Sequence, residues 1–393
     1  MKPETEEFPA LFRAVFTQPA IDNHAHPLLK EATRDKLAFE GLISEAEGAA
    51  LTEDAIHTVA CMRATKQLAK LFGLNEGTSW GDVKKHRAAM NYLELCKLCF
   101  SDAVIDTILI DDGLGGVAEM AEEYKWHDQF TPGRTKRIVR VEIVAETILK
   151  DLFASNTDPF TTVPQIVHVF EERLQQSLAQ SALESDVVGF KSIVCYRTGL
   201  DVSLQATGSS GKDIALKELF KMYSENQGRI RMAHKAVNDE VVRIALEVAG
   251  QHRIPVQFHT GLGDSDITLT RASPAQLQPI IKAYPGTKIV LLHSSYPFTR
   301  EAGYLTAVYH NVYLDFGEVF PFLSGEGQRA VIRQVLELSP TNKIMWSSDG
   351  HWWPESYYLG VIQARQALYE VLSELVRKDE ISEAQAIGIL YEL

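Results

Sequence analysis

Short apolar segments, many of them rich in β-branched residues, alternate along the chain with longer amphipathic segments. The short segments predict eight buried strands, at residues 19–25, 103–111, 136–145, 187–196, 254–260, 287–293, 311–316 and 343–348. The longer segments predict helices, most clearly at 213–226, 236–252, 274–284 and 326–337. Strand and helix that alternate eight times are typical of an α/β fold, the (β/α)8 TIM barrel of parallel strands.

The first connection between predicted strands is much longer than the others. Residues 28–102 contain several helix-like segments, of which 52–71 and 81–99 are the clearest. We therefore expect one barrel domain over residues 1–393, with 28–102 as an α-helical insertion between strands 1 and 2. Such an insertion would lie over the carboxyl ends of the strands, where a barrel forms its active site. It is then either a cap over that site or a wedge that only packs on the barrel.

Composition narrows the class of function. The 393 residues are 45% hydrophobic, enough for a large core, and their formal charge of −13 disfavours nucleic acid and anionic membranes as partners. No segment approaches the roughly 20 apolar residues of a membrane span, and the N-terminal residues do not resemble a signal peptide. The cysteines are too few for a disulfide framework. We therefore expect a cytoplasmic protein that acts on a small molecule.

Residues that can bind a metal recur at or near the ends of the predicted strands. Two histidines lie two positions apart on strand 1, so their imidazoles point to one face. A barrel of parallel strands would gather the whole set at one rim. Imidazole nitrogens and carboxylate oxygens suit zinc, with manganese as the alternative. In chain order the candidate ligands are His24, His26, Lys191, His259, His293 and Asp349.

The order and spacing of these residues resemble those of the amidohydrolase superfamily over nearly the whole chain. The segments GFKSIVCYRTGL, PVQFHTGLGDSD, LLHSSYPFTREAGYL, NVYLDFGE and SSDGHWWPE are similar to the amidohydrolase domain of fluG-type fungal developmental proteins, plant nodulin-like proteins and stand-alone bacterial relatives. In the fungal and plant proteins a glutamine synthetase-like domain follows, and nothing in this sequence resembles it. The resemblance thus implies such a domain as a partner, attached or separate, and allows the chain to be an excised domain.

The resemblance also implies roles for the candidate ligands. Residues that match His24, His26 and Asp349 bind the more buried metal in this superfamily. Residues that match His259 and His293 bind a second metal when there is one. Asp349 would accept a proton from the attacking water and hand it to the leaving amine.

The chemical state of Lys191 distinguishes two hypotheses for the metal site. In the first, it is N-carboxylated and bridges two ions. In the second, it stays a cation that pairs with the substrate or with Asp349, and one ion is held by the histidine pair, His259 and Asp349. His293 would then be a catalytic residue that forms a hydrogen bond with the substrate. The sequence leaves both readings open.

Further polar residues near the predicted rim are candidate substrate ligands. Arg197, at the end of strand 4, could hold a carboxylate through two hydrogen bonds. Asp264 and Asp266 could bind a substrate ammonium, or could cap the following turn. The other candidates, for which a structural role is the alternative, are Tyr296, Glu318 and His351.

These observations predict a metal-dependent hydrolase that cleaves a C–N bond of a small substrate. The association with glutamine synthetase-like domains suggests a γ-glutamyl amide or a related amino-acid derivative as the substrate. The first alternative is a metal-dependent decarboxylase or lyase of the same superfamily. The second is a regulatory or scaffold domain that acts through partners. The sequence fixes neither the substrate nor whether the chain forms a homo-oligomer.

Overall fold

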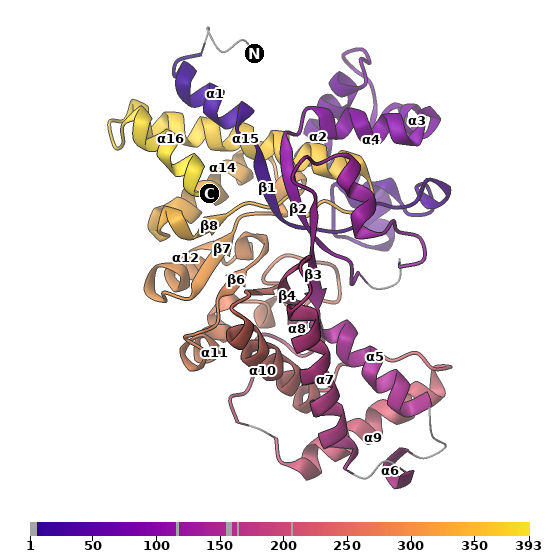
Figure 1. The fold of residues 1–393 in the computed structure, drawn as a ribbon. Coiled ribbons are helices and arrows are strands. Elements are labelled where there is room, and N and C mark those ends of the chain that lie inside the picture. Colours follow the sequence, from indigo (N-terminus) through magenta and orange to yellow (C-terminus); the bar gives the residue numbers. More distant parts are fainter. Residues whose placement is uncertain (1–5, 115–117, 155–158, 163–164, 206) are drawn as a thin grey trace.

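Eight parallel strands form a single sheet in the order β1-β2-β3-β4-β5-β6-β7-β8, as the alternating pattern predicts. The structure is a computed structural model that describes residues 6–114, 118–154, 159–162, 165–205 and 207–393 (Figure 1). The strands are β1 Ala20–Ala25, β2 Ile105–Asp111, β3 Thr135–Arg140, β4 Val187–Ser192, β5 Val256–Phe258, β6 Ile289–Leu291, β7 Val312–Asp315 and β8 Ile344–Met345. The fold is the predicted (β/α)8 barrel.

Hydrogen bonds between the main chains close the barrel near the carboxyl end of β1. The amide of Asn23 donates to the carbonyl of Trp346 (3.1 Å), and the amide of Asp349 donates to the carbonyl of His24 (3.1 Å). Below these bonds, among the described residues, β1 and β8 share no ladder, and Ile21 stays 62% exposed. The barrel is therefore closed where the candidate ligands lie and open beneath them.

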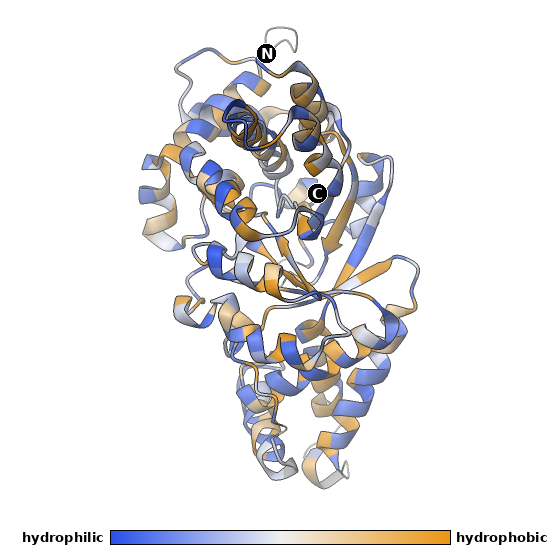
Figure 2. Ribbon diagram, turned by 90° about the vertical axis from the view of Figure 1, so that its left-hand side faces the viewer, coloured by the Kyte–Doolittle hydropathy of each residue, from blue (hydrophilic) through white to orange (hydrophobic). Residues whose placement is uncertain are grey.

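Helices surround the barrel and pack their apolar faces on it. In α10, the positions spaced as a helical stripe, Val237, Val241, Ile244 and Val248, are all buried. Blue and orange alternate along the outer helices in Figure 2, as expected for helices with one face on the core. The helices outside the first connection are α1 Pro9–Thr17, α5 Val141–Ala154, α6 Pro159–Thr162, α7 Ile166–Ala182, α8 Val194–Arg197, α9 Ser209–Glu225, α10 Lys235–His252, α11 Gln278–Ala283, α12 Thr299–Val308, α13 Val319–Phe322, α14 Gly325–Leu338, α15 Pro354–Arg377 and α16 Glu383–Glu392. Within the described residues, no helix combines the length and apolarity that a membrane crossing requires.

The long connection between β1 and β2 is helical and has an apolar core of its own. Trp353, from the loop after β8, is fully buried in that core beside Phe39. The predicted helices are divided, because the side chains of Thr58 and Asn91 cap the starts of α2 and α4. The elements are η2 Glu31–Thr33, η3 Phe39–Leu42, η4 Ala50–Asp54, η5 Ala55–His57, α2 Val59–Leu71, α3 Trp80–Ala89 and α4 Tyr92–Ser101.

The predicted strands are longer than the observed ones, and two of them extend furthest past the carboxyl end of the observed strand. The segment 136–145 leaves the sheet after Arg140, where α5 begins, and the segment 187–196 leaves it after Ser192. Arg197 consequently ends the short helix α8 and does not end a strand. The sequence-based assignment misses the start of α5 because Val141, Ile143 and Val144 are apolar and β-branched, and a short segment of this kind cannot be told from a strand by periodicity.

Candidate metal centre

Two histidines and an aspartate converge at the closed end of the barrel. The Nε2 atoms of His24, on β1, and His26, just after it, lie 3.5 and 3.6 Å from Oδ1 of Asp349, which follows β8. All three side chains are buried. Their ligand atoms lie within 4.8 Å of one another, so one ion could contact all three.

Hydrogen bonds at the Nδ1 atoms orient both imidazoles. Nδ1 of His24 lies 2.9 Å from the amide oxygen of Gln257, whose own amide nitrogen donates to the carbonyl of Asn23 (2.9 Å). Nδ1 of His26 lies 2.9 Å from the carbonyl of Asp111. Because an oxygen acceptor faces each Nδ1 atom, each neutral ring carries its proton on Nδ1. Nε2 of each ring then has a free lone pair on the side of Asp349.

A second group shares Asp349 with the first. His293, after β6, and Glu318, after β7, bring their ligand atoms within 4.8 Å of each other and of the Asp349 carboxylate. Nδ1 of His293 lies 3.6 Å from Oε2 of Glu318. The backbones of these three residues have positive φ angles of 66°, 62° and 50°. Non-glycine residues in this region cost about 1–3 kcal/mol each and concentrate at functional sites.

His259 and Lys191 stand beside these two groups. The ring of His259 lies 4.2 Å from that of His293, centroid to centroid, but its Nε2 is 2.6 Å from the carbonyl of Leu262. Nζ of Lys191 lies 2.7 Å from Nε2 of His24 and 3.8 Å from Oδ2 of Asp111. The fold therefore brings all six predicted ligands to one rim.

Three residues at the rim were not predicted from the sequence. Asp111 ends β2, and its Oδ2 accepts hydrogen bonds from Nε and Nη2 of Arg140 (3.0 and 2.6 Å), which ends β3. Both follow the rule that found the others, since both stand at the carboxyl ends of strands. Glu45, half-buried, comes from the connection between β1 and β2. No periodicity marks its position.

Buried aspartates fix the loops that carry the ligands. Oδ1 of Asp22, on β1, accepts the amide hydrogen of Ser348 (2.8 Å), the residue before Asp349. Oδ2 of Asp315, at the end of β7, accepts the amide hydrogen of His293 (3.2 Å). These bonds explain how short strands hold the ligands in defined positions.

A cavity of about 250 Å³ opens onto these groups. Five of the six predicted substrate ligands line it, whereas Tyr296 packs against the hydrophobic core and is not part of its wall. Trp352 and Glu45 also line it. The five are Arg197, Asp264, Asp266, Glu318 and His351.

The cavity wall carries charges of both signs. Nη2 of Arg197 lies 3.6 Å from Oε1 of Glu146, and its buried Nε has no hydrogen-bond partner. Nη1 of Arg231 lies 2.8 Å from Oδ2 of Asp266, so these two side chains form an ion pair. Asp264 accepts the amide hydrogen of Asp266 (2.9 Å), which fits the turn-capping role but leaves its carboxylate on the cavity wall. A small molecule with both an ammonium and a carboxylate would find partners here.

Burial keeps the candidate histidine ligands neutral, which is the form that binds metal, and acts against ionisation of the carboxylates. It lowers the pKa of His26 to about 3 and that of His24 well below its usual value, so both imidazoles are neutral. Burial raises the pKa of Asp349 to about 6, and a nearby cation would lower it again. Both ring nitrogens of His293, Oδ1 of Asp349 and Oε2 of Glu318 are buried without a hydrogen-bond partner. A divalent cation would satisfy these atoms, and a set of nitrogen and oxygen donors suits zinc or manganese.

Sequence comparison links the chain to known proteins. Residues 225–392 match the model of the amidohydrolase family. Protein fluG of Emericella nidulans is 38% identical over 395 residues, which cover 96% of this chain and 45% of that protein. The chain thus spans about half the length of this relative.

Structure comparison agrees with the sequence match. A protein from Lactobacillus casei ATCC 334, described as a metal-dependent hydrolase, superposes with a TM-score of 0.79 at 25% identity, covering 98% of this chain and 94% of that one. A uronate isomerase from Bacillus halodurans C-125 gives 0.64 at 15% identity, covering 100% and 95%. The isomerase shows a shared fold alone.

Proposed function

Because this chain belongs to the amidohydrolase family, we propose that it is a metal-dependent hydrolase that cleaves the C–N bond of a small amide. One observation carries the proposal. His24, His26, His293, Glu318 and Asp349 converge at the mouth of the barrel, and the ligand atoms of the last three are buried without a hydrogen-bond partner. Such a set is costly to bury unless a cation pairs with it.

The residues divide into two adjacent cation positions that share Asp349. His24 and His26 would hold the more buried ion, and His293 and Glu318 the second. Lys191, whose Nζ lies 2.7 Å from Nε2 of His24, would bridge the two positions if it were N-carboxylated. When bound, a divalent ion such as zinc supplies Lewis acidity, which polarises a carbonyl and lowers the pKa of a water molecule.

The chain's own residues move the proton. Oδ1 of Asp349 has no hydrogen-bond partner and accepts the proton of the attacking water. The same carboxyl group then delivers this proton to the leaving amine, without which the C–N bond would break to an unstable amide anion. In the one-ion alternative, His293 binds no metal, and one of its ring nitrogens, both unpartnered in the structure, donates a hydrogen bond to the substrate carbonyl, where negative charge develops.

The cavity suits an amino-acid derivative, and we infer a γ-glutamyl amide. Arg197, with its unpartnered Nε, is the binding group for the substrate carboxylate. Asp264 and Glu45 are the binding groups for its ammonium. The family resemblance described above implies a glutamine synthetase-like domain, and we propose such a domain as a partner because it would handle related glutamyl compounds.

The direct test is turnover by the metal-loaded protein. A panel of γ-glutamyl amides is supplied, and released amine is measured, with α-glutamyl and N-acetyl amides as controls. Preferential release from γ-glutamyl amides supports the proposal. Release of CO₂ from carboxylated substrates without amine release would assign a decarboxylase. Interconversion of uronates would assign an isomerase, and loss of all turnover in a fully loaded protein would favour a scaffold.

A further inference from the structure

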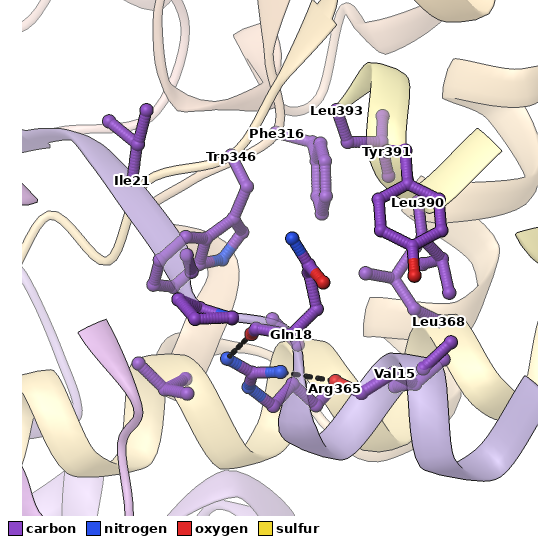
Figure 3. Close-up of a pocket in the computed structure, with 15 residues that line it drawn as sticks. Val15, Gln18, Ile21, Phe316, Trp346, Arg365, Leu368, Leu390, Tyr391 and Leu393 are labelled. Atoms are coloured by element: carbon purple, nitrogen blue, oxygen red, sulfur yellow. Dashed lines mark hydrogen bonds between the residues drawn. The ribbon is translucent and has the colours of Figure 1, made fainter. Parts of the chain in front are cut away.

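A second cavity lies outside the barrel, at the seam between β1 and β8 (Figure 3). It has a volume of about 240 Å³ and is enclosed by β1, α1, α15 and the C-terminal helix α16. Its walls are mainly apolar. Phe316, Trp346, Leu368, Leu390 and Tyr391 form most of them.

Its size and access suit a small organic molecule. An apolar cavity of about 150 Å³ can hold benzene, so about 240 Å³ accommodates a ring with a short chain. Ile21, which is 62% exposed, and Tyr391, which is 64% exposed, stand at its edge. A ligand can therefore enter from solvent without unfolding of the barrel.

Two hydrogen-bond donors of lining residues, Nε1 of Trp346 and Nε of Arg365, are buried without a partner. Trp346 is only 8% exposed. Its Nε1 atom is buried and makes no hydrogen bond in the structure. Figure 3 shows its indole facing the side chain of Gln18 across the cavity. A buried N–H without an acceptor is unfavourable, so a ligand that brings an acceptor is favoured here.

Arg365 is the single charged side chain among the residues that line the cavity. It is 9% exposed, and its Nη atoms donate to carbonyls of the main chain, including those of Val15 and Gln18. Among the described residues, no carboxylate lies within 4 Å of it. Burial lowers the pKa of Arg365 to about 10, so it remains a cation at neutral pH. Arg365 is therefore the one cation among the side chains that line this cavity.

We propose that this cavity binds a small monocarboxylate with an apolar body. Its carboxylate accepts the Nε1–H of Trp346 and lies in the positive field of Arg365. Its ring or chain packs between Phe316, Leu368 and Leu390. The site is separate from the metal centre, and its occupancy does not depend on which reaction the protein catalyses.

Three probes of one shape test the charge requirement on the metal-loaded full chain. They are 3-phenylpropanoate, 3-phenylpropan-1-ol and 3-phenylpropan-1-amine, and their affinities are measured by titration calorimetry. The carboxylate should bind at least about tenfold more tightly than the alcohol, because hydrogen bonds to charged groups are stronger than neutral ones. The amine should bind most weakly. Equal affinities for all three, or no binding of any, would overturn the proposal.

Variants locate the bound probe. Ala14→Phe, on the half-buried face of α1, should fill the cavity and abolish carboxylate binding, while Ala307→Phe on α12, also half-buried, should leave it unchanged. Trp346→Phe keeps an aromatic ring in the wall but removes the Nε1–H donor, and it should weaken binding of the carboxylate probe about tenfold. Arg197→Met, in the metal-site cavity, should have no effect. Binding that survives Ala14→Phe in a folded variant, or that is lost with Arg197→Met, would place the probe elsewhere and refute the site.

Discussion

Gln257 on β5 holds His24 on β1 from across the barrel interior, with its amide oxygen 2.9 Å from Nδ1 of the imidazole. The bond fixes the proton on Nδ1 and leaves Nε2 to bind metal. Gln257→Leu should therefore weaken metal affinity about 10- to 100-fold, as loss of the hydrogen-bond partner of a metal-binding histidine does in other proteins. Gln257→Glu retains an oxygen acceptor for Nδ1 of His24 and should therefore lose much less metal affinity. Competition with a metal-buffering chelator measures both, and equal affinity in wild type and Gln257→Leu would show that the bond does not tune the ligand.

Lys191 distinguishes a two-ion from a one-ion centre. If it is an N-carboxylated bridge, wild type should contain about two ions per chain and Lys191→Ala about one, with most activity lost. Added bicarbonate or a short carboxylic acid should partly restore both, because either can occupy the vacated position. One ion in both proteins would refute the bridge and would favour the single-ion site in which His293 only contacts substrate.

Arg197 should act on substrate binding more than on the chemical step. Arg197→Met should raise KM for a carboxylate-bearing amide about 10- to 100-fold and change kcat little, because hydrogen bonds to charged groups are worth about 1.5–3 kcal/mol. Arg300→Met, at a side chain that is 69% exposed, is the matched control. A fall in kcat with unchanged KM would remove Arg197 from the substrate site.

His127 should make stability depend on pH. Its Nε2 accepts the amide hydrogen of Leu28 (3.0 Å), and burial lowers the pKa of His127 to about 4. The unfolded chain has the ordinary value of about 6.5, so between these values only the unfolded state binds the proton. Above about pH 6.5 the neutral His127 makes its full contribution to the free energy of unfolding. This contribution falls as the pH drops toward 4, and the loss reaches about 2 kcal/mol at pH 5.

Denaturant unfolding of wild type and His127→Gln at pH 7 and pH 5 checks this. The free energy of unfolding should drop less between pH 7 and pH 5 in His127→Gln than in wild type, by about 2 kcal/mol. The exposed histidine variant His310→Gln should behave as wild type. An equal drop in His127→Gln would mean that another group causes the loss.

The sequence predicted the barrel because strand and helix patterns alternate over its whole length. It failed at strand ends such as residues 141–145, where β-branched residues in the first turn of a helix resemble a strand. The candidate metal-binding rim was predictable where a metal-binding residue type follows a strand, as at His259 and His293. Asp111 and Arg140 close strands too, but they pair with each other, and a carboxylate or guanidinium alone does not indicate a metal ligand.

Glu45 and Gln257 lay beyond sequence reasoning for different reasons. Glu45 reaches the cavity from an irregular segment, and its position depends on how the whole insertion packs around Trp353. Gln257 is a neutral residue within an apolar strand, and its role appears only when β1 and β5 face each other across the barrel. Contacts between distant segments leave no local pattern that periodicity can detect.

The metal content of a histidine double variant tests the central claim most directly. His24→Ala/His26→Ala removes two neutral imidazoles from the more buried position, and His57→Ala/His310→Ala removes two exposed ones as a control. After identical loading with zinc and removal of excess ion, elemental analysis should find stoichiometric metal in wild type and control and only a small residue in the double variant. Undiminished metal in a folded His24→Ala/His26→Ala protein would contradict the metal centre and the hydrolase built on it.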